Sequence, residues 1–297
     1  MFLVEIAALS AATCWAVGSI VSVMPVERLG TIGFNRVRML IVFAMLGSYV
    51  TIFGGWETIQ QDQIAEIMLS GFIGILLGDT ALFATMNRLG PRRTAILFST
   101  NAPMSTLLGW IFLDEALPPM ALMGTILVIA GVILAIVYGK RRDQLHKWEA
   151  IKGPLVIGVG IGLIAALGQS VGSLIAKPVM ASGADPFAVS AMRVGVTAIG
   201  LVILCSAPVQ AFKLKTKLDS QIITHIVISG FLGMFVGMTL ILYALARGDV
   251  GIVATLSATT PVIMLPLMWF RTKERPAIGA WIGAMIVVIG TGLIFMG

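Results

Sequence analysis

The chain has 297 residues, of which 58% are hydrophobic and only 11% are charged, and its formal net charge is +6. Because a soluble domain is typically about 25% charged, this composition excludes a soluble enzyme or binding domain and indicates an integral membrane protein. The longest connection between apolar segments, residues 139–153, is too short for an extramembrane domain, which needs about 50 residues or more.

A window of about 19 residues divides the chain into ten apolar segments, each able to cross a hydrocarbon core about 30 Å thick. The segments are continuous apolar runs without the alternation of a lipid-facing β-strand. We therefore predict an all-α membrane protein with ten transmembrane helices. The predicted helices cover residues 3–24, 31–53, 66–87, 93–113, 119–138, 154–177, 186–208, 222–245, 250–270 and 276–296.

Basic residues gather in or beside alternate connections. Of the 20 Lys and Arg residues, 17 belong to the connections after odd-numbered helices, whereas the even-numbered connections hold only Lys177 and Arg247. The positive-inside rule then places the odd-numbered connections in the cytoplasm and both termini outside, with the chain in the cell inner membrane. The positive charge reflects this topology and contact with the lipid bilayer, so no nucleic-acid partner is expected.

The two halves of the chain resemble each other. Residues 70–74 (SGFIG) recur as residues 229–233 (SGFLG), and the same spacing of 159 residues pairs Trp110 with Trp269. We predict two five-helix repeats, 1–138 and 154–297, joined by a basic cytoplasmic loop over 139–153. Since five is odd, the second repeat starts on the opposite side of the membrane, and the repeats are inverted relative to each other.

Several motifs of this chain resemble one known family. They are Trp15 with Gly18 and Ser19 in the first helix, Arg38 and Arg193 early in the second helix of each repeat, the segment GDTALFATMNRLG with its counterpart GMTLILYALARGD, Pro103 and Pro261, and Glu115 and Glu274. Together they resemble the EamA-type branch of the drug/metabolite transporter superfamily over nearly the whole chain. The resemblance implies a carrier of small metabolites, frequently an exporter, with a central cavity between the repeats.

The two repeats differ at two motif positions. Gln169 stands where the first repeat has Trp15, and Met238 stands where it has Asp79. The two halves of the expected cavity are therefore chemically unequal.

Asp79 is the first candidate for a functional residue. It lies near the middle of the third predicted helix, where an acidic side chain costs at least about 2.5 kcal/mol. One interpretation is a protonated or hydrogen-bonded carboxyl group that holds helices together. The other is a cavity-facing carboxylate that contacts a substrate amine or exchanges a proton during transport. The sequence leaves both open.

Other polar and aromatic residues are expected to face the same cavity, with ordinary helix packing as the alternative. Prolines in the fourth and ninth helices free backbone groups, which are tolerated in a membrane only beside protein or water. The predicted substrate-binding set is Asp79, Trp15, Ser19, Phe83, Thr100, Asn101, Gln169, Ser173, Thr239, Tyr243, Thr259 and Thr260.

Six residues are assigned structural roles. Arg38 and Arg193 lie about two turns from a membrane interface, so we expect them to anchor their helices by snorkelling. Glu115 and Glu274 are expected to hold loops, and Pro103 and Pro261 to shape the fourth and ninth helices.

The predicted function is secondary transport, in the export direction, of a small polar or amphipathic metabolite such as an amino acid, by alternating access. No Gly-rich ATP-binding loop, metal-ligand motif or catalytic constellation occurs, so no cofactor, metal or enzymatic activity is expected. An importer of the same fold is the alternative, and a channel or an intramembrane enzyme is the alternative from another class. The substrate, the coupling ion and the oligomeric state stay open; a monomer is compatible with the sequence.

Overall fold

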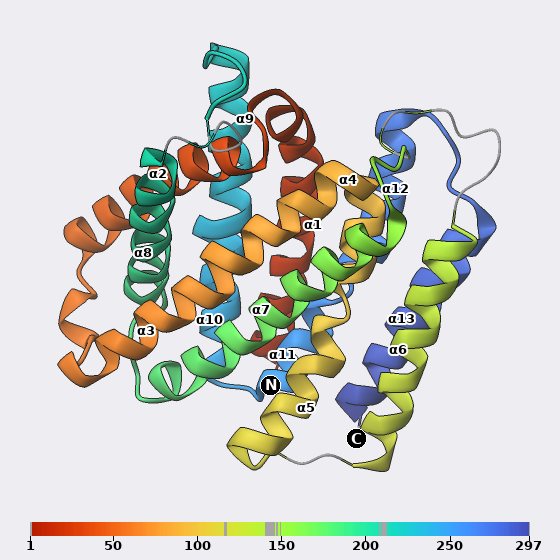
Figure 1. The fold of residues 1–297 in the computed structure, drawn as a ribbon. Coiled ribbons are helices and arrows are strands. Elements are labelled where there is room, and N and C mark those ends of the chain that lie inside the picture. Colours follow the sequence, from red (N-terminus) through yellow and green to blue (C-terminus); the bar gives the residue numbers. More distant parts are fainter. Residues whose placement is uncertain are drawn as a thin grey trace.

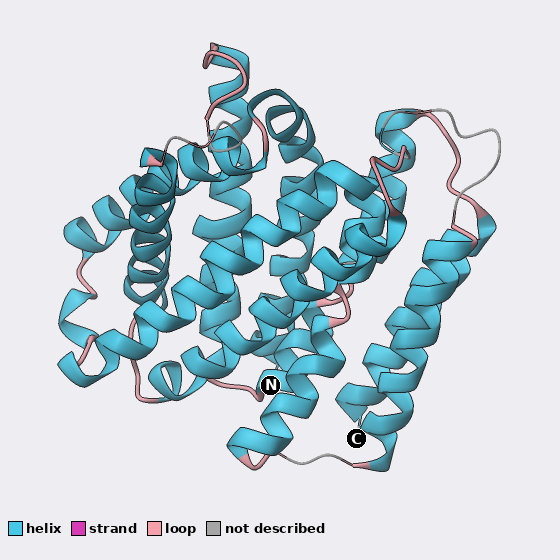
Figure 2. Cartoon of the chain, in the orientation of Figure 1, coloured by secondary structure: helices cyan, strands magenta, loops and turns pink. Residues whose placement is uncertain are grey.

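The computed structural model describes residues 2–115, 118–139, 146, 148, 150–207, 209 and 213–296. Most of the predicted basic loop at 139–153, including Lys140, Arg141, Arg142 and Lys147, lies outside the described residues. In the described part every regular element is a helix (Figure 2). The helices are α1 (Phe2–Leu29), α2 (Thr31–Phe53), α3 (Ile64–Gly71), η3 (Phe72–Leu77), α4 (Gly78–Phe98), α5 (Asn101–Leu113), α6 (Pro119–Val137), α7 (Leu155–Ala181), α8 (Pro186–Ser206), α9 (Ser220–Gly230), η6 (Phe231–Met238), α10 (Thr239–Leu245), α11 (Val250–Ser257), α12 (Thr260–Thr272) and α13 (Ile278–Met296), with two short 3₁₀ turns, η1 (Trp56–Thr58) and η2 (Gln61–Gln63).

Seven helical segments of the described chain are long and apolar enough to cross a membrane, and Ile278–Ile294 forms a shorter apolar helix. The chain is therefore a multi-pass membrane protein. In Figure 1 the adjoining ends of α1 and α2, of α6 and α7, of α8 and α9 and of α12 and α13 lie at one end of the bundle, here named the basic end. The start of α1, the end of α13 and the adjoining ends of α2 and α3, of α5 and α6, of α7 and α8 and of α10 and α11 lie at the opposite end, here named the terminal end.

The prediction of single continuous helices over 93–113 and 250–270 is wrong. The first is interrupted between α4 and α5 at residues 99–100, and the second between α11 and α12 at residues 258–259. Pro103 and Pro261 cause these breaks, because proline has no amide hydrogen and its ring collides with the carbonyl group four residues earlier. Hydroxyl groups supply replacement hydrogen bonds: Thr100 Oγ1 donates to the Leu97 carbonyl at 2.7 Å and Thr259 Oγ1 to the Leu256 carbonyl at 2.9 Å.

A second paired irregularity lies in the third and eighth predicted helices. The segments η3 and η6 are π-helical and occupy corresponding positions in the two halves. Their glycines let a neighbouring helix approach closely: a Cβ atom on Gly74 would lie 3.2 Å from the Gly172 Cα atom of α7. Such π-helical turns are frequent at functional sites.

The helices pack in exchanged pairs. α1 contacts α9, η6 and α10, while α7, the corresponding helix of the second half, contacts α3, η3 and α4. α2 packs against α8, and α6 packs against α13 at one side of the bundle (Figure 1). Each half therefore completes the core of the other, and the space between α1, α4, α7 and η6 lies at the centre.

The pair α6 and α13 is held together by glycines. A Cβ atom on Gly124 would lie against the Gly290 carbonyl oxygen, and one on Gly131 would lie 2.7 Å from the Gly283 carbonyl oxygen. The later glycine of α6 thus meets the earlier glycine of α13, so the two helices run antiparallel. Without side chains at these positions the backbones pack directly, as is usual for small residues in membrane helices.

Glu115 connects the end of α5 to the start of α11. Its carboxylate accepts hydrogen bonds from the Val250 amide at 2.9 Å and the Gly251 amide at 3.4 Å. It satisfies amide groups that the first turn of a helix leaves without partners. Burial of the half-buried side chain nevertheless raises the pKa of Glu115 above its ordinary value, against the opposing effect of these hydrogen bonds.

Gly290→Ala should destabilise the protein by about 1–3 kcal/mol, because the new methyl group would overlap backbone atoms of α6 that cannot move aside. Gly292→Ala, two residues further along the same helix, is the matched control, since a Cβ atom there meets no atom within 4 Å. Thermal unfolding in detergent should show a lower midpoint for Gly290→Ala alone. Equal midpoints for the two variants would contradict the close packing of α6 and α13.

Glu115→Gln should change how stability depends on pH. A raised carboxyl pKa means that the folded state favours the protonated form, so this contribution to stability is present at low pH and is lost as pH rises through the raised pKa. The unfolding midpoint of the unmodified protein should therefore fall relative to that of Glu115→Gln as the pH rises from below the ordinary glutamate pKa through the raised pKa of Glu115. Glu66→Gln, at an exposed position, is the control and should leave the pH dependence unchanged; parallel curves for Glu115→Gln would refute the assignment.

Candidate functional site

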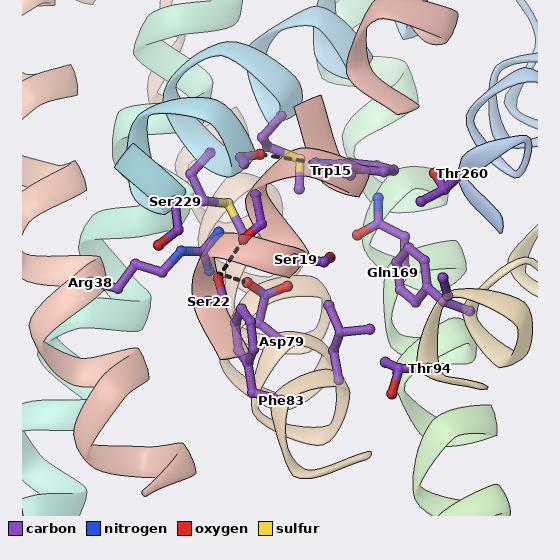
Figure 3. A pocket seen from close by; sticks show the side chains of 17 residues that line it. Trp15, Ser19, Ser22, Arg38, Asp79, Phe83, Thr94, Gln169, Ser229 and Thr260 are labelled. Atoms are coloured by element: carbon purple, nitrogen blue, oxygen red, sulfur yellow. Dashed lines mark hydrogen bonds and ion pairs between the residues drawn. The ribbon is translucent and has the colours of Figure 1, made fainter. Parts of the chain in front are cut away.

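A small cavity lies at the centre of the bundle, between helices of both halves, and its lining is mostly apolar with several polar side chains. Its volume is about 50 Å³, and its walls come from α1, α2, α4, α7, α9, η6 and α12 (Figure 3). That volume holds a few water molecules but is too small for most metabolites. The cavity is therefore nearly closed in this conformation.

A buried ion pair forms one wall of the cavity. The Arg38 Nη1 atom of α2 donates to the Asp79 Oδ2 atom of α4 at 2.9 Å (Figure 3), and these residues are only 4% and 6% exposed. The two α-helices also interact through Asn35 Nδ2, which donates to Thr80 Oγ1 at 3.2 Å. The pairing compensates the charge of Asp79 inside the membrane, where an isolated carboxylate would be costly.

The expectation that Arg38 and Arg193 snorkel to a membrane interface is wrong. Arg193 is only 1% exposed, and its Nη1 atom contacts the Met238 Sδ atom at 3.3 Å. Both arginines point into the bundle because glycines of the opposite half leave room for them. A Cβ atom on Gly233 would lie 2.6 Å from Arg38 Nη2, and one on Gly74 would lie 3.0 Å from Arg193 Nη2.

Trp15 closes the cavity on the side of η6. Its Nε1 atom donates to the Gly233 carbonyl at 2.9 Å, and its ring lies edge-on to Phe98 with centroids 6.0 Å apart. A π-helical turn changes the spacing of backbone donors and acceptors, and here the indole satisfies one carbonyl group of that turn. Gln169 occupies the corresponding position of α7, and its Nε2 atom instead donates to Ser173 Oγ of the same helix at 3.5 Å.

Apolar side chains close the cavity toward both ends. Toward the basic end lie buried Phe83, Met86 and Trp148, and the Phe83 ring packs edge-on against Phe34 with centroids 4.8 Å apart. Toward the terminal end a second buried cluster includes Ala11 of α1 and Val253 of α11. The central cavity is thus separated from both ends of the bundle by hydrophobic packing.

The structure brings about half of the predicted substrate-binding residues together. Trp15, Ser19, Asp79, Phe83, Gln169 and Thr260 line the central cavity. Asn101 and Ser173 instead line a smaller cavity of about 10 Å³ toward the terminal end, which Gln169 also borders.

The remaining predicted residues lie elsewhere. Thr100 borders an apolar groove between α5, α6 and α7, and Thr239 and Tyr243 border a separate pocket of about 650 Å³ near the connection between α7 and α8. Thr259 donates to a backbone carbonyl at the helix break and does not line the central cavity. Glu115 caps α11, and Glu274 accepts a hydrogen bond from the His146 amide at 3.0 Å. Pro103 and Pro261 lie in the first turns of α5 and α12.

Several lining residues were not predicted from the sequence. Ser22 lies one helical turn after Gly18, so its place on the same face of α1 was detectable from spacing. Ser229, Met234 and Met238 come from α9 and η6. Met238 was detectable through the repeat, because it corresponds to Asp79, whereas no signal in the sequence singled out Ser229 and Met234.

Comparisons with known proteins identify the family and the fold. The family model described as the EamA-like transporter family matches residues 2–137 and again residues 156–296. An uncharacterized protein of Methanocaldococcus jannaschii is 31% identical over 130 residues, which make up 44% of this chain and 90% of that protein. That relative is therefore about as long as one half of this chain.

A solved crystal structure shares the fold, with a TM-score of 0.78 at 15% sequence identity, covering 99% of this chain and 96% of that one. The two matches of the family model cover nearly all of the sequence and coincide with the two halves that pack around the central cavity. The chain belongs to the EamA-like transporter family, whose members are membrane transporters of the drug/metabolite transporter superfamily.

Proposed function

We propose that this protein is a secondary transporter that exports a small polar or amphipathic metabolite, such as an amino acid, by alternating access. The observation that carries the proposal is the central cavity with its buried ion pair, enclosed between the two halves and closed by apolar residues toward both ends. An enzyme or a continuous pore has no need of such an arrangement. Export is favoured by the family resemblance, with import as the alternative direction.

The proposed architecture is ten membrane crossings in two inverted five-helix repeats. Three observations support it. The halves exchange equivalent helix contacts, with α1 on η6 and α7 on η3. Gly124 and Gly131 correspond to Gly283 and Gly290 at the repeat spacing of 159 residues. The contact between Gly124 and Gly290 is therefore the repeat equivalent of the contact between Gly131 and Gly283. The basic residues concentrate at one end, which favours a cytoplasmic basic end and an external terminal end in the inner membrane.

Phe83 connects the ion pair to the closure at the basic end. The Arg38 guanidinium lies 5.0 Å from the centroid of the Phe83 ring, which in turn packs against Phe34. A substrate amine or a proton that competes for Asp79 would release Arg38 and weaken its cation–π contact with Phe83. Binding in the cavity would thereby loosen the apolar closure. The glycine contacts of η3 and η6 allow the neighbouring helices to slide as the cavity opens.

Purified protein in proteoliposomes tests the proposed class. Amino acids loaded inside should exchange with labelled amino acids outside in a saturable manner, because a carrier exposes its site to one side at a time. Non-saturable flux would indicate a channel, and chemical conversion of the compound would indicate an enzyme. Comparing cells with and without the protein for compounds that accumulate inside or outside establishes the direction.

Asp79→Asn should abolish counterflow and destabilise the protein by about 3–5 kcal/mol, because Arg38 loses its carboxylate partner inside the membrane. Arg38→Gln combined with Asp79→Asn removes both charges, and should recover stability without recovering counterflow. Asp62→Asn, at an exposed position, serves as the control. Counterflow and unfolding midpoint are measured for all three; normal transport by the double variant would mean that the ion pair serves folding only.

A further inference from the structure

The buried charges at the centre of the bundle do not balance. Arg38, Asp79 and Arg193 are each at least nine-tenths buried, and Asp79 is the only acidic residue that pairs with either arginine in the described part of the chain. Its carboxylate accepts a hydrogen bond from Arg38, and it attracts Arg193 only through space. Two guanidinium groups therefore share one carboxylate, which leaves a formal charge of +1 at membrane depth.

Arg193 is the arginine without an adequate partner. Its Nε and Nη2 atoms are buried and form no hydrogen bond within the described residues, and its Nη1 atom contacts only the weakly accepting Met238 sulfur at 3.3 Å. A buried guanidinium ordinarily places its donors on carboxylates or carbonyl groups. The geometry thus leaves donors for a planar anion beside the cavity wall.

The internal repeat explains why Arg193 has no carboxylate partner. Arg193 corresponds to Arg38, and Met238 lies 159 residues after Asp79, so each arginine faces the same position of its own half. In the first half that position holds the carboxylate, and in the second it holds a thioether. The second half has kept the cation and lacks the acid, although an unpaired buried charge is costly.

Met238 separates Arg193 from the central cavity. Its side chain lines the cavity and also contacts the Arg193 Nη1 atom at 3.3 Å, whereas Arg193 itself does not line the cavity. Methionine is unbranched and flexible, so it can rotate away without displacing η6. A small movement of this side chain would expose the free donors of Arg193 to a molecule in the cavity.

We propose that Arg193 binds the carboxylate of the transported metabolite, with Met238 as its displaceable cover. A monocarboxylate supplies the single negative charge that the three buried groups lack, and its planar oxygens match the fork of a guanidinium. Asp79 lies on the same cavity and is available to an amine of the same molecule. This assignment rests on the proposed transport function and specifies the class of its substrate.

Substitutions that supply or remove charge test the assignment without transport. Met238→Asp places a carboxylate where the first half has one, and should raise the unfolding midpoint in detergent. Arg193→Met removes the unpaired cation, and should leave the midpoint unchanged or raised. Met234→Asp is the matched control: Met234 also lines the cavity, but the sulfur atom on Arg193 is that of Met238, and this variant should lower the midpoint. A Met238→Asp variant as unstable as Met234→Asp would overturn the proposal.

Ligand-dependent stabilisation provides the second readout. Sodium isobutyrate should raise the unfolding midpoint of the unmodified protein, whereas isobutyramide, which lacks the negative charge, should not. The shift should disappear in both Arg193→Met and Met238→Asp. An equal shift with sodium chloride would indicate a site for inorganic anions and would overturn the assignment to a carboxylate.

Counterflow separates this proposal from the general transport function. L-leucine, L-phenylalanine and L-threonine are each compared with the corresponding amide, and removal of the carboxylate should reduce counterflow by at least about a hundredfold. Equal counterflow of acid and amide would overturn the role of Arg193 while leaving the transporter assignment intact. Absence of saturable counterflow for every compound, together with a carboxylate-dependent midpoint shift, would contradict the transport function and retain the binding site.

Discussion

The absence of water in the hydrocarbon region is the constraint on which this structure depends. Every polar group placed there must find its partner within the protein. The Arg38–Asp79 ion pair meets this requirement: its nitrogen and oxygen atoms are 2.9 Å apart, and both residues are almost completely buried. The pair joins α2 to α4, and the arginine extends into the space left by Gly233 of the other half. One electrostatic contact thereby positions helices of both halves around the cavity.

Duplication supplied a symmetric scaffold, and substitution made its centre asymmetric. The helix breaks before Pro103 and Pro261 and the π-helical turns η3 and η6 recur at corresponding positions. The residues that face the cavity do not: Trp15 corresponds to Gln169, and the Asp79 position of the second half holds methionine. A small molecule whose two ends differ in charge or polarity needs different side chains on the two sides of its binding site. In the proposed transport cycle, the symmetric backbone would provide paired motions and the unequal side chains would orient the transported molecule.

The helix breaks and π-helical turns are also where sequence reasoning reached its limit. Proline indicated that the fourth and ninth predicted helices were irregular, but hydropathy alone registers a continuous apolar run across a break. Apart from Asn101, the residues around Ser99 and Ala258 are apolar or hydroxylated, so a hydropathy window gives no sign of the interruption. Likewise, a π-helical turn rotates the following residues about the helix axis. Regular spacing puts Met234 and Met238 on one face of their helix, but it does not specify which neighbouring helices that face meets.

The sequence by itself determined the membrane class, the helical character and the repeat, and it singled out Asp79 as a candidate, because these follow from local hydropathy, from charge placement and from self-similarity. Only the tertiary structure decided which polar groups meet. The partnership of Arg38 with Asp79 spans 41 positions, and the isolation of Arg193 depends on glycines of the opposite half. Snorkelling was a reasonable expectation from depth along a helix, but the direction of a side chain about the helix axis depends on neighbouring helices, which no single segment specifies.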